Sequence, residues 1–204
     1  MIIKTFIEPP IENNNYLLID EESREAALID CSSYDKNIEQ ELNENNATLK
    51  YILLTHGHFD HIAGLNQPLR ETAQVLMHAN DDEWVSEVNT YLPMLGMPSM
   101  VVPKIDKYIN DKEIIKLGNT EIEVIHTPGH TQGGVCFYVK GTLFSGDTIF
   151  KESVGRCDLP GGDFEQIVKS IETKIFTLPP ETIILSGHGK PTTVAWEKEH
   201  NNYL

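Results

Sequence analysis

Thr55-His56-Gly57-His58-Phe59-Asp60-His61 is the most informative segment of the chain, because four of its residues are potential metal ligands. It follows an apolar run at residues 50–55 (KYILLT) that predicts a strand. His56 and His58 are two residues apart, so in an extended segment both can point toward one cation. Asp60 and His61 begin a predicted helix and can face a second cation nearby. Burying these groups unpaired would be costly, so the segment predicts a metal site.

Three later loops each add one potential ligand directly after a predicted strand. They contain His130 in Thr-Pro-Gly-His-Thr, Asp147 in Ser-Gly-Asp-Thr and His188 in Ser-Gly-His-Gly. The glycine beside each ligand allows a close approach of the backbone. The alternative, a set of ordinary polar turn residues, requires the same pattern to arise by chance in four loops.

Composition and charge exclude several classes of protein. The 204 residues are 40% hydrophobic and 23% charged, which is typical of a globular chain. The formal charge of −15 would repel a phosphate backbone, which argues against nucleic-acid partners and against an RNA-processing nuclease. Three widely spaced cysteines favour a reducing compartment over a disulfide framework. With no signal-peptide or membrane-span pattern, we expect a cytoplasmic protein without a membrane partner.

The order of predicted elements indicates mixed α and β structure in one domain, residues 1–204. Strands in runs, with helices after some of them, predict two packed sheets with helices outside. Residues 92–103, with three prolines, predict an irregular segment whose methionines pack rather than form a mobile lid. We expect strands at 2–7, 16–20, 26–31, 50–55, 74–78, 105–108, 113–117, 121–126, 135–139, 142–145 and 182–186, and helices at 34–45, 60–72, 81–91, 164–176 and 194–200.

The motifs THGHFDH, TPGHT, SGDT and SGHG occur in the order typical of the metallo-β-lactamase superfamily, which the chain resembles over nearly its whole length. The resemblance implies an α+β fold, an αββα sandwich with metals at one edge of the two sheets. It implies two divalent ions, with zinc the first choice and iron or manganese the others. One ion would be bound by His56, His58 and His130, and the other by Asp60, His61 and His188, with Asp147 bridging them.

Within the superfamily the chain is most similar to the glyoxalase II (hydroxyacylglutathione hydrolase) group, through THGHFDH, HTPGHT and SGDT followed by Gly155-Arg156. Residues 156–163 and the closing Asn-Asn-Tyr-Leu look more like short bacterial relatives and persulfide dioxygenases, so we expect the chain to be complete. It then has no C-terminal helical substrate domain, which in full-length glyoxalase II helps hold glutathione. The thiol carrier therefore stays open.

Arg156 is the expected contact for a carboxylate of the substrate. In the glyoxalase group a basic residue nine positions after the bridging aspartate contacts the thiol carrier. Here Asp158 stands where that group often has a tyrosine. An ordinary surface arginine is the alternative.

The resemblance implies a hydrolase of small thioesters in which a metal-bridging hydroxide attacks the thioester carbonyl. Two divalent ions bring +4, while Asp60, Asp147 and the hydroxide bring −3, which leaves about +1 beside the developing oxyanion. Asp60 and Asp147 are the expected catalytic residues. A thiol leaving group with a pKa near roughly 8.5 needs little protonation, which favours a thioester or ester over an amide. The oligomeric state stays open.

Two other functions remain compatible with the ligand set. One is a persulfide dioxygenase-like oxidoreductase with a single iron on His56, His130 and Asp147. The other is a non-catalytic metal-binding protein. A β-lactamase is disfavoured, because it would be secreted and the commonest kind carries a cysteine in place of Asp147.

The remaining polar groups receive structural interpretations. His78 is expected to cap a turn or fill space, and His126 to support the core or the site. Cys157 is expected to be a small turn residue rather than a redox group. The acidic runs at 20–22 and 81–83 are interpreted as solvated faces or helix starts.

Overall fold

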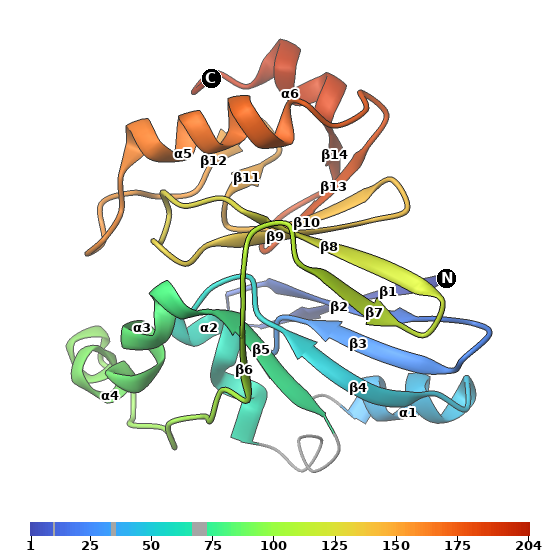
Figure 1. Ribbon diagram of the computed structural model, residues 1–204. Helices are drawn as coiled ribbons and strands as arrows, with labels where there is room; N and C mark the ends of the chain where they lie inside the picture. Colours follow the sequence, from blue (N-terminus) through green and yellow to red (C-terminus); the bar gives the residue numbers. More distant parts are fainter. Residues whose placement is uncertain (10, 34–35, 67–72) are drawn as a thin grey trace.

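Two six-stranded sheets pack face to face at the centre of the molecule, as the ribbon in Figure 1 shows. The structure, a computed structural model, describes residues 1–9, 11–33, 36–66 and 73–204. The N-terminal sheet has the order β1 (Ile2–Glu8), β2 (Asn13–Ile19), β3 (Glu25–Ile29), β4 (Thr48–Leu53), β5 (Gln74–His78) and β6 (Lys107–Ile109). The first three strands are antiparallel, and β3 to β6 are parallel.

The C-terminal sheet is antiparallel except for the β10–β13 pair. Its order is β14 (Thr192–Thr193), β13 (Ile183–Ser186), β10 (Thr142–Gly146), β9 (Val135–Val139), β8 (Thr120–His126) and β7 (Ile114–Leu117). A separate two-stranded ribbon is formed by β11 (Ile149–Phe150) and β12 (Ser153–Val154).

Helices cover the outer face of each sheet (Figure 1). On the N-terminal sheet they are α1 (Lys36–Glu44), α2 (Phe59–Ile62), α3 (Asp82–Ser86) and α4 (Val88–Tyr91), and on the C-terminal sheet they are α5 (Phe164–Ser170) and α6 (Val194–His200). No helix in the described part of the chain is long and apolar enough to cross a bilayer.

Three apolar layers hold this arrangement together. In β2, Leu17 and Ile19 face the outer helices, whereas Tyr16 and Leu18 face the second sheet. A third layer fills the space between the C-terminal sheet and α5, around residues such as Ile167. Strands buried on both faces read as continuous apolar runs rather than alternating ones. The predicted αββα sandwich is therefore confirmed.

Several predicted helices are shorter or less regular than expected. The helix predicted at 60–72 is α2 followed by a 3-10 turn, Ala63–Asn66, and its remainder lies outside the described residues. The one predicted at 81–91 divides into a 3-10 turn (Ala79–Asp81), α3 and α4, because Glu87 leaves helical geometry at φ −97° and ψ 14°. The helix predicted at 164–176 continues from α5 into a π-helical turn, Ile171–Ile175. That wider turn keeps isoleucines spaced four residues apart on the sheet-facing side.

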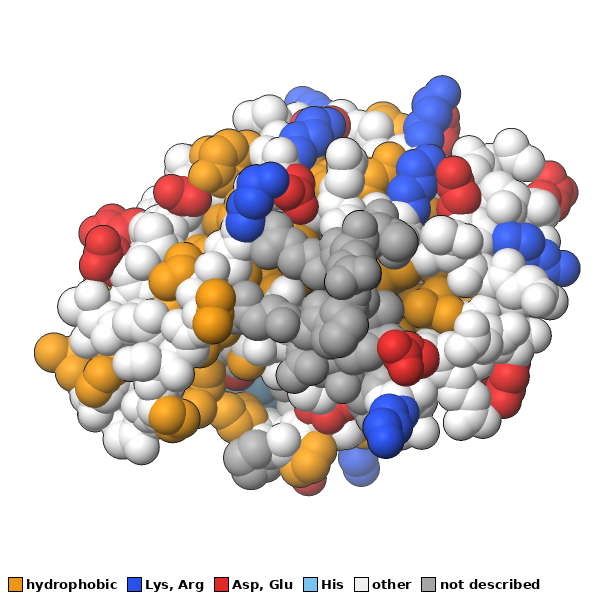
Figure 2. Space-filling model, turned by 90° about the horizontal axis from the view of Figure 1, so that it is seen from below, with side chains coloured by type: hydrophobic (Ala, Val, Ile, Leu, Met, Phe, Trp, Pro, Cys, Tyr) orange, Lys and Arg blue, Asp and Glu red, His pale blue; other side chains and the backbone are white. Residues whose placement is uncertain are grey.

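The segment after α4 is irregular, as predicted, but its methionines do not share one environment. It begins with a 3-10 turn, Leu92–Leu95, and then has no regular structure before β6. Met100 packs on the core, whereas Met94 is 84% exposed, so the packing prediction is wrong for Met94. Figure 2 shows apolar side chains gathered at the left of the face seen from below, the side on which α4 lies in Figure 1.

Candidate metal centre

All seven predicted ligands lie in loops or turns that follow strands, or in the short helix α2. The loop after β4 carries His56 and His58 and continues into α2 with Asp60 and His61. The turns after β8, β10 and β13 carry His130, Asp147 and His188. Because the structure brings these turns to one edge of the sandwich, residues far apart in sequence become neighbours.

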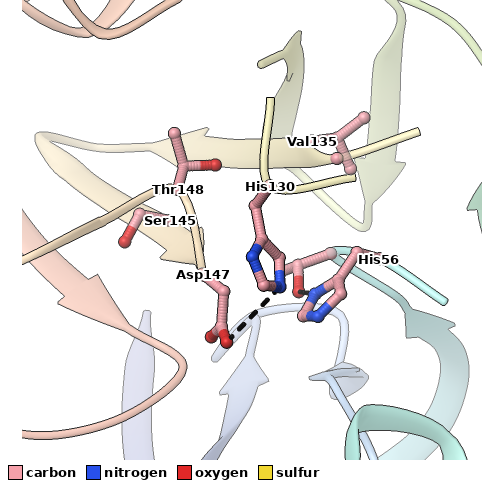
Figure 3. A pocket seen from close by; sticks show the side chains of 8 residues that line it. His56, His130, Val135, Ser145, Asp147 and Thr148 are labelled. Atoms are coloured by element: carbon pink, nitrogen blue, oxygen red, sulfur yellow. Dashed lines mark hydrogen bonds and ion pairs between the residues drawn. The ribbon is translucent and has the colours of Figure 1, made fainter. Parts of the chain in front are cut away.

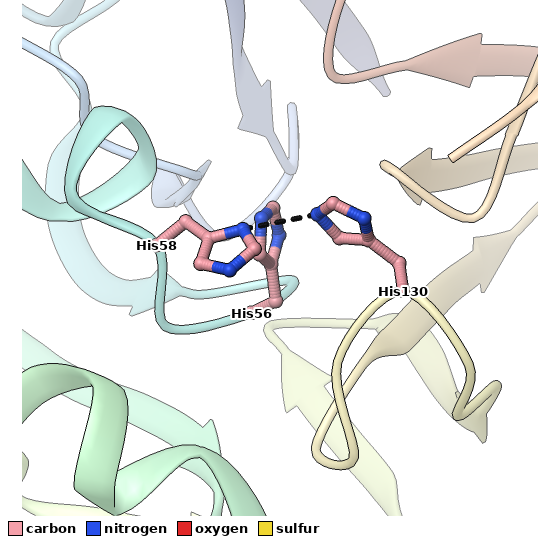
Figure 4. Close-up of side chains that lie close together, drawn as sticks. All are labelled: His56, His58 and His130. Carbon is pink, nitrogen blue, oxygen red and sulfur yellow. Dashed lines mark hydrogen bonds between the residues drawn. The ribbon is translucent and has the colours of Figure 1, made fainter. Parts of the chain in front are cut away.

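His56, His58 and His130 form the first group, here called the three-histidine cluster. One nitrogen of each ring lies within 4.8 Å of the others. Figure 4 shows the three rings turned toward one another from two separate loops. His58 Nδ1 and His130 Nε2 are 3.0 Å apart. A cation bound between these nitrogens would take the place of the proton that they share in this hydrogen bond.

Burial keeps the imidazoles of His56 and His58 neutral. Desolvation lowers the pKa of His56 well below its usual value, and the neighbouring histidines lower it further. Desolvation, followed by His130, lowers the pKa of His58 to about 3. Neutral imidazole is the form that binds a metal ion.

Asp60, His61 and His188 form the second group, here called the mixed cluster, and their ligand atoms also lie within 4.8 Å of one another. Asp60 Oδ2 is 3.7 Å from His61 Nε2 and 3.4 Å from His188 Nε2. Burial alone would raise the pKa of Asp60, but the adjacent His61 and His188 outweigh it and hold this pKa below its usual value. Asp60 is therefore an anionic ligand candidate.

Asp147 lies between the two clusters. Its Oδ1 is 3.5 Å from His61 Nε2, and its Oδ2 is 3.7 Å from both His130 Nε2 and His188 Nε2. Figure 3 shows Asp147 beside His130 and His56 in the pocket that they help line. Its carboxylate reaches ligand atoms of both clusters, which is the arrangement that a bridging ligand requires.

In His61 and His130, a hydrogen bond from one ring nitrogen determines which nitrogen faces the centre. His61 Nδ1 donates to Asp30 Oδ2 at 2.8 Å, and His130 Nδ1 donates to the Arg156 carbonyl at 2.7 Å. In the neutral ring, which is the form that binds a metal ion, the proton on Nδ1 leaves the lone pair of Nε2 directed toward the centre in both residues. Asp30 also accepts from the amide and hydroxyl of Thr55 at 2.8 Å.

The donor set fits a pair of divalent cations. His56 Nε2, His58 Nε2 and Asp147 Oδ1 are buried without a hydrogen-bond partner. Buried polar atoms of this kind are rare unless something satisfies them. The histidine and aspartate clusters are typical of a dinuclear metal site, and a cation in each would satisfy His56 Nε2 and Asp147 Oδ1.

Sequence reasoning missed four residues that surround the clusters. Asp81 stands at a helix start, the N-cap of α3, which agrees with one of the two predictions for the run at 81–83. It is not solvated, because it is 0% exposed and accepts three hydrogen bonds. Asp30 directly follows a buried strand, a position that signals a site residue. Trp84 packs edge-on against His58 at 4.5 Å between ring centroids. Asn13, which lies outside the predicted strands at 2–7 and 16–20, is a buried residue of β2 whose Nδ2 is 3.1 Å from His61 Nε2.

The side chains of three other residues singled out in the sequence, Arg156, Cys157 and His78, make ordinary local contacts. The guanidinium of Arg156 is exposed and makes two 2.7 Å contacts with the carboxylate of Asp158. Burial raises the pKa of Cys157, which stays a thiol and donates to the Gly155 carbonyl. His78 accepts from the Asn80 amide as a cap.

Comparisons with known proteins agree with this geometry. The family model of the metallo-beta-lactamase superfamily matches residues 10–188. Hydroxyacylglutathione hydrolase GloC of Haemophilus influenzae is 34% identical over 202 residues, covering 93% of this chain and 92% of that protein.

Two solved structures have the same fold. BLEG-1 B3 metallo-beta-lactamase superposes with a TM-score of 0.90 at 34% identity, covering 100% of this chain and 99% of the other. TTHA1623, solved in a di-iron-bound form, has a TM-score of 0.86 at 30% identity, covering 98% and 100%. By fold, by motif order and by the match over most of its length, the chain belongs to the metallo-beta-lactamase superfamily.

Proposed function

We propose that the chain is a metal-dependent hydrolase of small thioesters. The observation that carries the proposal is the convergence of seven histidine and aspartate side chains, three in each cluster and Asp147 between them. Three of their atoms are buried without a hydrogen-bond partner. The similarity to a hydroxyacylglutathione hydrolase over nearly the full length of both chains supports the substrate class.

The three-histidine cluster would hold one ion and the mixed cluster the other, with Asp147 shared between them. Two divalent ions bound there would polarise a carbonyl oxygen and acidify a water molecule. Zinc suits this mixture of imidazole and carboxylate. The di-iron form of a similar protein makes iron the second choice.

The chain's own residues orient the metal ligands, set the charge of the site and offer a contact for the substrate. Asp30 and the Arg156 carbonyl hold the His61 and His130 rings in the tautomer that directs Nε2 inward. Asp60 and Asp147 carry two negative charges, fewer than two divalent ions bring, so net positive charge would remain to stabilise an oxyanion. Arg156 would bind a carboxylate of the substrate if Asp158 releases its side chain.

β-lactam hydrolysis is a second candidate function. It is favoured by one observation, the TM-score of 0.90 and 34% identity to a B3 metallo-beta-lactamase. A persulfide dioxygenase-like reaction with a single iron is a third candidate, because the same ligands would hold that ion.

Hydrolysis of S-lactoylglutathione by the zinc-loaded chain tests the proposal. We expect turnover that a chelator abolishes and that His188→Ala lowers by at least roughly 100-fold, since loss of outer partners alone costs about 10- to 100-fold. His200→Ala is the matched control, because His200 lies exposed at the end of α6. It should keep the parent rate.

Assays with other substrates distinguish the three candidate functions. No turnover of S-lactoylglutathione or of simpler thioesters by the parent chain would refute the proposal. Efficient cleavage of a chromogenic cephalosporin, or oxygen consumption with a persulfide by iron-loaded chain, would assign the second or third function instead.

A further inference from the structure

Asp81 is a fully buried carboxylate outside the set of proposed metal ligands. It ends the 3-10 turn that follows β5, and its side chain accepts three hydrogen bonds. Oδ2 accepts from the Gly57 amide at 2.9 Å and from the Thr131 hydroxyl at 2.7 Å, and Oδ1 accepts from the Gly133 amide at 2.6 Å. A buried carboxylate requires partners of this kind.

All three donors belong to the loops that supply the three-histidine cluster. Gly57 lies between His56 and His58, in the loop that follows β4 of the N-terminal sheet. Thr131 directly follows His130, in the turn after β8 of the C-terminal sheet. One carboxylate therefore joins the two sheets at the place where their histidines meet.

The two glycines show how closely the loops approach Asp81. A Cβ atom on Gly57 would lie 2.8 Å from the Asp81 carbonyl oxygen, and one on Gly133 would lie 2.6 Å from Asp81 Cγ. Cβ atoms essentially never make contacts below 3.0 Å. The two loops can therefore approach Asp81 this closely only because both positions are glycine.

We propose that Asp81 is a positioning residue that holds the two halves of the three-histidine cluster at the separation that a metal ion requires. It acts through the backbone beside His56 and His58 and through the hydroxyl beside His130. The inference depends on one part of the proposed function, namely that this cluster binds a metal ion.

The mixed cluster has a different anchor. His61 donates to Asp30, whose other hydrogen bonds come from Thr55 and not from the three donors that Asp81 binds. Loss of Asp81 should therefore weaken one of two metal-binding steps and spare the other.

Metal titration of the full-length chain tests this selectivity. Chain stripped of metal is titrated with Zn²⁺ against a competing chelator and with Co²⁺ followed by visible absorption. Asp81→Asn preserves size but replaces one accepting oxygen with a donor. We expect it to weaken, by roughly 10- to 100-fold, the same binding step that His58→Ala abolishes, and to change the Co²⁺ spectrum of that step alone. Thr131→Val removes one donor and should give a smaller loss.

Asp20→Asn is the matched control. Asp20 is also buried and accepts from the Ser23 amide and hydroxyl at 2.9 Å and from the Thr120 hydroxyl at 2.7 Å, away from the histidine loops. It should lower stability while leaving both metal-binding steps as in the parent chain.

Amide hydrogen exchange provides a readout that needs no metal. In the metal-free chain, Asp81→Asn should speed exchange at Gly57 and Gly133, whose amides donate to Asp81, and Asp20→Asn should not.

Two results would overturn the inference. One is parent-like binding of both ions by Asp81→Asn. The other is an equal weakening of both steps, which would indicate general destabilisation. If the parent chain binds no metal at all, the proposed function fails instead, and the exchange rates still decide whether Asp81 holds the two loops together.

Discussion

Two replacements of Asp30 should distinguish its contribution to the stability of the fold from its contribution to the assembly of the mixed cluster. Asp30 is buried and accepts from the Thr55 amide, the Thr55 hydroxyl and His61 Nδ1, each at 2.8 Å. Asp30→Ala leaves the buried Thr55 amide and the His61 ring without an acceptor, and each such loss costs about 1–3 kcal/mol. Asp30 also has φ of 58°, where alanine adds strain of roughly 1 kcal/mol. We therefore expect a loss of about 5 kcal/mol in the free energy of unfolding.

Asp30→Asn should behave differently, because asparagine tolerates a left-handed backbone and keeps one accepting oxygen. Its amide nitrogen would face His61 Nδ1, which can then accept only if the ring proton moves to Nε2. That proton would occupy the nitrogen directed at the centre. We expect a loss of about 1–2 kcal/mol in stability, together with a 10- to 100-fold loss, roughly, of metal affinity at the mixed cluster.

Urea unfolding in the presence of chelator measures the first effect, and Zn²⁺ competition measures the second. Asp30→Asn should weaken the binding step that His188→Ala abolishes more than the other step. Asp30 reaches the three-histidine cluster only indirectly, through the Thr55 hydroxyl, which lies 3.1 Å from His56 Nδ1. Parent-like affinity for both ions in Asp30→Asn would refute the tautomer argument. Equal free energies of unfolding for Asp30→Ala and Asp30→Asn would refute the argument that buried donors without an acceptor destabilise the alanine variant.

Three further outcomes follow from single contacts. Gly187→Ala would place Cβ 2.3 Å from Asp147 Oδ1, so the carboxylate must move and thioesterase activity should fall by about 100-fold; undiminished activity would contradict the placement of Asp147. Hydrogen bonds, first from a neighbouring backbone amide, lower the folded-state pKa of Asp20 to about 2. Because that pKa lies below the unfolded value of about 3.9, its contribution to stability is present above the unfolded pKa and is lost as pH falls through the folded one. The stability difference between the parent and Asp20→Asn in urea unfolding should therefore shrink between pH 4 and pH 2, and a constant difference would contradict the assignment. For a thioester that carries a carboxylate, Arg156→Gln should raise KM without changing kcat. Asp158→Asn should lower KM, because it frees the Arg156 guanidinium. An effect of Arg156→Gln on kcat in steady-state assays would place Arg156 at the reacting atoms instead.

The apolar pattern was enough to predict two layers of strands, because strands buried on both faces read as continuous apolar runs. The interruptions of the helices were not predictable in the same way. The break at Glu87 and the π-helical turn at Ile171–Ile175 depend on how each helix meets the sheet beneath it, and local propensity does not contain that information. The same limit explains Met94, whose apolar side chain is exposed although its spacing suggested packing.

The sequence alone predicts which residues gather at the centre, since the potential ligands stand in short motifs after apolar strands. The contacts that hold them there depend on the packing of distant segments. Asp30 contacts residues 25 and 31 positions away, and Asp81 contacts residues 24 to 52 positions away. No local pattern marks Asp81 as buried, because the burial of an acidic side chain is tolerable only when donors from distant loops arrive at its oxygens. Those donors meet Asp81 only after the two sheets have packed.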